Sequence, residues 1–146
     1  MTQLPAIDTV LGKWRAEGIK LLPPATEATV VAALDKTGKQ YSQDVVALYC
    51  ATGGMEMNES DHSMWALWSL EQVISENKAS NHAHLLFSDY LIFSHLYYFK
   101  YESEEKSSIY LDHFVGEPPV IVAASVNEFF ELYLKNPEKL EMFLGS

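Results

Sequence analysis

The sequence is poor in cysteine and in long hydrophobic runs, and each shortage excludes a class of protein. The single cysteine, Cys50, rules out an internal disulfide, and its place in the apolar segment 45–51 predicts a buried thiol. No apolar run approaches the roughly 18 residues of a membrane-spanning helix, and the first residues carry no apolar signal segment. We therefore expect a cytoplasmic protein with no membrane partner.

Positive charge is also scarce. Ten lysines and arginines stand against 20 aspartates and glutamates, which gives a formal net charge of −10, and Arg15 is the sole arginine. Binding to a phosphate backbone depends on lysine and arginine, so we expect no direct contact with nucleic acid. A strongly negative field favours encounter with basic macromolecules instead.

The sequence contains no G-x-G-x-x-G, P-loop, H-E-x-x-H or G-x-S-x-G motif. Its apolar surroundings make Cys50 a poor nucleophile, because a reactive thiolate needs an electropositive, partly exposed setting. His82 and His84 form the one close histidine pair, but structural zinc sites need four donors, and we predict neither a metal nor a cofactor. Asp89 and Asp112 could serve as the acid and base of a hydrolase. We favour the simpler interpretation, in which one is a turn aspartate and the other a solvent-facing strand aspartate.

Residues 85–114 hold the densest run of aromatic and branched apolar residues. From Leu91 to Tyr101 nearly every second residue is aromatic or aliphatic, and this two-residue period predicts a strand with one apolar face that needs a cover. The polar segment 102–106 interrupts the run, which resumes as Ser108–Asp112. We predict two antiparallel strands joined by an exposed connection.

Helical patterns surround this stretch. Residues 3–17 predict an amphipathic helix that docks on the core, and Thr26, Ser42, Ser69 and Ser125 each stand at an expected helix start. Residues 65–68 and 120–123 read as short strands, and Thr52, Gly53 and Gly54 as a helix end. The fold class that follows is α+β, with one mixed, largely antiparallel sheet and helices packed against it. We expect a single domain over 1–146, in which 1–24 add a helix and a connector to a core at 25–144.

Five segments of this core follow one another in a recognisable order and spacing. They resemble the Knr-type (Smi/Knr-like) branch of the SUKH superfamily. The segments are Thr26–Leu34 with Gly38, Tyr41–Tyr49 with Gly53 and Gly54, Trp65–Val73, Ser108–His113, and Ala124–Leu132.

The resemblance implies a domain that binds other proteins and is not an enzyme. Bacterial members of the family are similar to immunity proteins that neutralise a cognate toxin, often a nuclease, and an acidic surface suits such a basic partner. A regulatory adaptor or a small-ligand module of the same fold is the alternative, and the oligomeric state stays open. Acids and tyrosines grouped around the 102–106 connection are the expected contacts: Asp89, Tyr98, Glu102, Glu104, Glu105, Tyr110 and Asp112.

Overall fold

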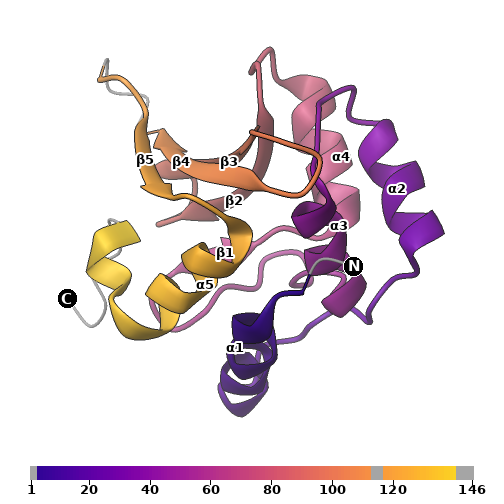
Figure 1. Ribbon diagram of the computed structural model, residues 1–146. Helices are drawn as coiled ribbons and strands as arrows, with labels where there is room; N and C mark the ends of the chain where they lie inside the picture. The colour runs from indigo at the N-terminus through magenta and orange to yellow at the C-terminus, as the bar shows by residue number, and fades with distance from the viewer. Residues whose placement is uncertain (1–2, 113–116, 141–146) are drawn as a thin grey trace.

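The computed structural model describes residues 3–112 and 117–140, so His113 and the end of the expected domain beyond Leu140 lie outside the described residues (Figure 1). The elements follow one another as α1 (Pro5–Ala16), α2 (Glu27–Asp35), α3 (Gln43–Ala51), β1 (Trp65–Leu67), α4 (Leu70–Ala79), β2 (Leu85–Tyr90), β3 (His95–Tyr101), β4 (Ser107–Asp112), β5 (Val120–Ala123), α5 (Val126–Lys135) and the 3-10 turn η1 (Pro137–Leu140). Within the described ranges, no helix has the length and apolar character that crossing a bilayer demands.

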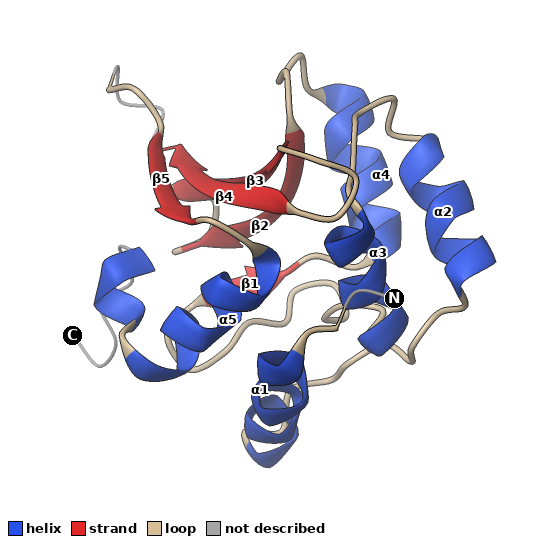
Figure 2. Cartoon of the chain, viewed as in Figure 1, coloured by secondary structure: helices blue, strands red, loops and turns tan. Residues whose placement is uncertain are grey.

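The five strands form one sheet in chain order, β1-β2-β3-β4-β5, and each neighbouring pair is antiparallel. Figure 2 shows α5 and α1 on one side of this sheet, α4 beside β2, and α2 packed on the outside of α3 and α4. The expected α+β class, with one sheet and helices packed against it, is confirmed. The sheet is antiparallel at every strand pair, which corrects the expectation of a mixed sheet. The short strands at 65–68 and 120–123 are confirmed as β1 and β5.

The prediction of two strands over 85–114 is wrong, because this stretch makes three. β2 ends at Tyr90, four residues turn the chain, and β3 begins at His95. Leu91, Ile92 and Phe93 occupy the turn with φ values of 53°, 51° and 65°. No glycine, asparagine or proline marks the turn, and Ile92 and Phe93 favour strands, so local composition does not reveal it.

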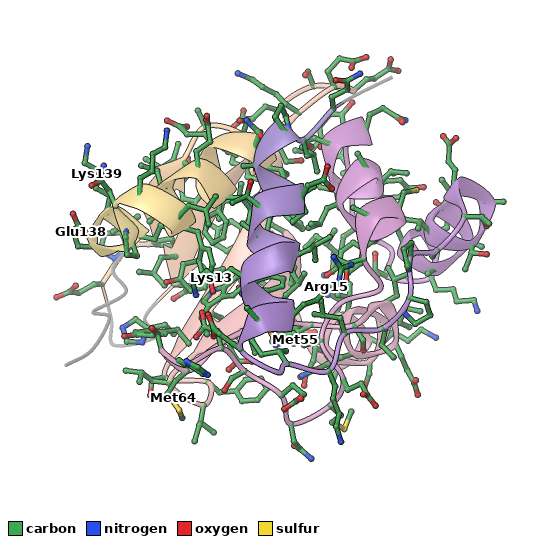
Figure 3. All side chains as sticks on the ribbon, turned by 90° about the horizontal axis from the view of Figure 1, so that it is seen from below. Lys13, Arg15, Met55, Met64, Glu138 and Lys139 are labelled. Atoms are coloured by element: carbon green, nitrogen blue, oxygen red, sulfur yellow. The ribbon has the colours of Figure 1, made fainter. Side chains whose placement is uncertain are left out.

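An aromatic cluster at the centre of the core joins the sheet to α1 and α5. The Trp65 ring from β1 stacks on the Trp14 ring from α1 at 5.9 Å between centroids, and it lies 5.7 Å from the Phe129 ring of α5. Phe129 also meets the edge of Tyr97 on β3. All four side chains are fully buried. Helix α1 is therefore an integral part of the core, and Figure 3 shows it lying between α5 and α3.

Three of the four expected helix caps form. The side-chain oxygens of Thr26, Ser69 and Ser125 accept bonds from the amides three residues on, at 3.2, 3.1 and 3.1 Å. Ser42 precedes α3 but makes no such bond. Its hydroxyl instead contacts the Asp44 carboxylate and lies 2.6 Å from the Ser107 hydroxyl.

Asn77 on α4 protects the edge of β2 where β1 no longer covers it. Its side-chain oxygen accepts a bond from the Leu86 amide at 3.0 Å, and its side-chain nitrogen donates to the Leu86 carbonyl at 2.8 Å. One buried side chain thus takes the place of a neighbouring strand at this residue.

Gly53 and Gly54 follow α3, and the backbone comes too close to its neighbours there for any side chain. A Cβ on Gly53 would lie 2.7 Å from the Pro23 carbonyl oxygen, and one on Gly54 would lie 2.5 Å from the Trp68 carbonyl oxygen. Gly54 also has a φ of +97°, a value that favours glycine. The pair therefore does more than end the helix, because it lets three chain segments meet.

Candidate protein-binding surface

A column of stacked rings covers the face of β3 and β4 that points away from α5. The His84 ring stacks on the Tyr98 ring at 5.1 Å, and the Tyr98 ring stacks on the Tyr110 ring at 5.4 Å, with interplanar angles of 6° and 8°. The Lys100 ammonium lies 5.6 Å from the centre of the Tyr110 ring. We call His82, His84, Tyr98, Lys100, Tyr110 and Asp112 the tyrosine face.

The strand register explains why these residues meet. Tyr98 is the direct partner of Tyr110 in the β3–β4 pair, and Leu96 is the partner of Asp112. Side chains alternate across a strand, so Tyr97 and Phe99 enter the core while Tyr98 faces the other way. The loop between α4 and β2 then delivers His82 and His84 to the same face.

His82 links the column to an acid. Its ring lies 4.6 Å from the Tyr98 ring, its Nε2 is 3.7 Å from Asp112 Oδ2, and its Nδ1 accepts a bond from the His84 amide at 3.1 Å. Burial, with help from His82 and Lys100, lowers the pKa of His84, which favours its neutral form. Burial, followed by Tyr110 and Asp112, raises the pKa of the Tyr98 phenol.

Exposure separates the members of the column by role. Only 5% of Tyr98 is exposed, so its ring supports its neighbours and offers little surface to a partner. Tyr110, His84 and Asp112 are half-buried and present one side to solvent. Of the expected tyrosine contacts, Tyr110 is therefore the one with surface to offer.

The three glutamates of the 102–106 connection differ in their attachments. Glu102 accepts a hydrogen bond from the Ser108 hydroxyl at 2.6 Å. The main-chain carbonyls of Glu104 and Glu105 accept bonds from the amides of Gln43 and Asp44, at 2.7 and 3.2 Å, which ties the connection to the start of α3. The three residues are exposed, so acidic side chains project from a connection held at both ends.

Asp89 lies apart from the tyrosine face, close to the β2–β3 turn. It accepts a bond from Trp68 Nε1 at 2.6 Å and a longer one from the Phe93 amide at 3.4 Å. Burial raises the pKa of this carboxyl, although both hydrogen bonds oppose the rise. Leu96 separates Asp89 from Asp112 across the strands, so their backbones lie two strand spacings, about 10 Å, apart.

Cys50 is half-buried, which corrects the expectation of a buried thiol. It lines a hollow of about 560 Å³ between the starts of α1 and α2 and the outer side of α3. Burial, followed by the charge of Glu27, raises the pKa of the thiol and disfavours the reactive thiolate.

From the sequence, His82 and His84 were considered only as metal ligands and not as part of a binding surface. Neither Lys100 nor the β2–β3 turn was predicted as part of a site. Among the described residues, no three histidine, cysteine or acidic side chains are placed to hold a metal ion. The alternation of His82 and His84 on an extended segment was the available signal for a shared face. No signal in the composition pointed to the turn.

No family model and no curated protein matched this chain.

Proposed function

We propose that this protein is a non-enzymatic protein-binding domain of the immunity type, which neutralises a cognate basic toxin in the cytoplasm. The observation that carries the proposal is the tyrosine face, where the half-buried Tyr110 lies on β4 between Asp112 and Ser108, the residue whose hydroxyl bonds to Glu102. Tyrosine anchors protein interfaces because its ring supplies contact area and its hydroxyl supplies a hydrogen bond.

Charge supports the same proposal. A net charge of −10 speeds association with a basic partner and opposes binding to a second acidic protein. The resemblance to Knr-type SUKH domains, expected from the order of five sequence segments, points to the same class of partner. A basic nuclease-type toxin fits both considerations.

A small-ligand module, or a regulatory adaptor, is the second candidate. A hollow of about 310 Å³ borders the tyrosine face and is lined by Leu86, Leu96 and His82 among others. That volume is at the lower end of ordinary ligand sites. A thermal-shift screen with metabolites tests this candidate, because ligand at a hundred times its dissociation constant stabilises the fold by about 2.7 kcal/mol.

Co-purification with the protein encoded beside it tests the proposed function. We expect a tight complex that inhibits the toxin, and we expect simultaneous reversal of Glu102, Glu104 and Glu105 to lysine to weaken it about tenfold or more. Reversal of Glu117, Glu131 and Glu138 changes net charge equally and serves as the control, since these exposed residues lie elsewhere. Binding that survives the first reversal removes this site assignment.

A further inference from the structure

A second recess lies on the same side of the sheet as the tyrosine face. It is a groove of about 510 Å³ between the 57–64 loop, the exposed side of α4 and the β2–β3 turn, and we call it the hairpin groove. Ala66 and Asp89, which pair across β1 and β2, lie along it. Glu76 and Phe93 also line the 310 Å³ hollow next to the tyrosine face, so the two recesses adjoin at these residues.

Large apolar side chains stand exposed at the hairpin groove. Met57, Met64, Ile92 and Phe93 line it with exposed fractions of 67%, 39%, 74% and 46%, and Leu91 adjoins it at 42%. These are five of the seven large apolar side chains that are exposed among the described residues. Figure 3 shows Met64 at the rim of the molecule. Exposed apolar residues scattered singly are ordinary, but a cluster of them marks an interaction site.

The backbone of this cluster is unusual as well. In the described ranges, five residues other than glycine have positive φ, and all of them line or adjoin the groove: Asn58, Met64, Leu91, Ile92 and Phe93. Asparagine tolerates this conformation, whereas a β-branched residue such as Ile92 strongly disfavours it. Nothing in the local fold demands isoleucine here, because its side chain points to solvent and fills no core.

A hydrogen-bond network holds the turn in this conformation. The Leu91 amide donates to the Met64 carbonyl at 3.0 Å, and Asp89 accepts from both the Phe93 amide and Trp68 Nε1. The Phe93 ring lies 5.8 Å from the buried Trp68 ring. The apolar side chains are therefore presented by a fixed support, which lowers the entropy lost when a partner binds.

Charge defines what the groove accepts. Its lining includes the carboxyls of Glu59, Glu71, Glu76 and Asp89 and includes no lysine, arginine or histidine. Glu71 and Glu76 both line the groove from α4, and neither makes a salt bridge with a described residue. The walls of the groove therefore combine apolar side chains with negative charge and no positive charge.

We propose that the hairpin groove binds a basic segment of a partner protein that carries apolar side chains between its lysines or arginines. The proposal deepens the proposed function and rests on it, because it states the chemistry of the segment that the partner inserts. Apolar side chains of the segment pack against Ile92, Phe93 and Met64, and its cations face Glu71 and Glu76. This is the arrangement by which grooves take amphipathic segments of other proteins.

Other occupants fit less well. A second copy of this chain brings its own excess of acids against the four carboxyls of the groove, and an anionic lipid surface or a nucleic acid meets the same repulsion. Charge complementarity thus selects a cationic partner, and the exposed apolar residues select one that is also amphipathic.

The test is a titration of the whole protein with a fluorescent amphipathic peptide made of lysine and leucine. We expect saturable binding that is lost when glutamate replaces the peptide's lysines and when serine replaces its leucines. Ile92→Asn should weaken binding about tenfold while raising the midpoint of thermal unfolding by about 3 °C, because asparagine tolerates positive φ. A more stable protein that binds less tightly cannot be explained by damage to the fold.

A matched pair of charge variants completes the test. Glu71→Gln with Glu76→Gln should weaken peptide binding about tenfold, whereas Glu131→Gln with Glu138→Gln, which changes net charge equally, should leave it unaltered. Equal weakening by both pairs means non-specific attraction and overturns the proposal, as does unchanged binding by Ile92→Asn. A dimer that dissociates in Ile92→Asn also overturns it, since a second copy would then fill the groove.

The peptide measurement needs no cognate partner, so the groove proposal and the proposed function are tested independently. A co-purified toxin whose binding requires the 102–105 glutamates, with no groove variant affecting the peptide, overturns the groove alone. Selective peptide binding in the groove, with no neighbouring toxin bound, overturns the proposed function.

Discussion

The Trp14 indole donates a hydrogen bond from Nε1 to the Tyr133 hydroxyl at 2.7 Å. The same hydroxyl donates to the Asp61 carboxylate, which also accepts the amides of Ser63 and Trp65 at 2.8 and 2.9 Å. Three distant segments, α1, α5 and the loop before β1, therefore meet at one phenolic oxygen. Burial, followed by the charge of Asp61 and the bond to it, raises the pKa of this phenol far above its usual range, so it stays a donor.

Tyr133→Phe should lower the free energy of unfolding by about 2 kcal/mol or more. The change removes one hydroxyl but leaves two buried groups, the Trp14 N–H and one oxygen of Asp61, without that partner. Urea unfolding measures the loss. Tyr101→Phe is the control and should change stability by less than about 0.5 kcal/mol, because the Tyr101 hydroxyl bonds to no described residue. Equal losses in the two variants would contradict the role of the Tyr133 hydroxyl.

Asp89 should make stability fall as pH rises above about 4, where a free aspartate loses its proton. Burial raises the pKa of folded Asp89, so between the unfolded and folded pKa values the native protein holds a proton that the unfolded chain has released. The unfolded state then binds fewer protons, and the free energy of unfolding declines with pH in that window.

Comparison of the wild type with Asp89→Asn isolates this contribution. Asp44, whose pKa burial also raises, titrates in both proteins and cancels from the difference. We expect the wild type to lose stability relative to the variant as pH rises through the window, measured by urea unfolding at a series of pH values. Parallel pH profiles would show that the Asp89 pKa is not raised.

Three glycine-to-alanine variants should rank in an order set by backbone conformation and space. Gly12→Ala, inside α1 and open to solvent, should stabilise by about 1 kcal/mol. Gly38→Ala has space but a φ of +73°, and should destabilise by about 1 kcal/mol. Gly54→Ala adds a clash with the Trp68 backbone and should destabilise by about 3 kcal/mol or more. Thermal unfolding of the three variants checks the order, and a Gly54 variant as stable as the Gly38 variant would refute it.

Cys50 should react slowly with iodoacetamide at neutral pH, because its raised pKa keeps the thiol protonated. Glu27→Gln removes the second cause of the rise, so the alkylation rate should increase at neutral pH and its pH profile should move to lower pH. Glu56→Gln serves as a control for net charge, because Glu56 is exposed and does not line the hollow beside Cys50. Equal rates in the two variants would mean that Glu27 does not act on the thiol.

Local signals predicted the helices and the short strands well because their causes are local. Three serine and threonine caps form as expected, since an N-cap needs only the side chain and an amide three residues on. The cap predicted at Ser42 does not form, because the Ser42 hydroxyl bonds to Asp44 and to Ser107 on β4 instead. The turn after Tyr90 was not predicted, because the hydrogen bonds that hold it come from Met64 and Asp89, which lie outside the turn.

The candidate site also has features that follow from local sequence and features that depend on tertiary contacts. Alternation along β3 and β4 was enough to group Tyr98 with Tyr110 and Asp112 once the strands were paired. It did not reveal that Tyr98 is buried, since the covering His84 comes from a loop whose path depends on tertiary contacts. The hairpin groove is assembled from three separate segments of the chain, so no single stretch of sequence predicts it.

Strand order has a consequence for how the molecule assembles during synthesis. Every strand pairs with its neighbour in the chain, so the sheet is able to grow one strand at a time as the polypeptide emerges. Trp14 is different, because its partner Tyr133 is 119 positions further along. The Trp14 ring is able to stack on Trp65 once β1 has formed, but its contacts with Phe130 and Tyr133 wait for α5. The core around α1 is therefore completed late, and the unfinished polypeptide exposes aromatic surface that favours aggregation.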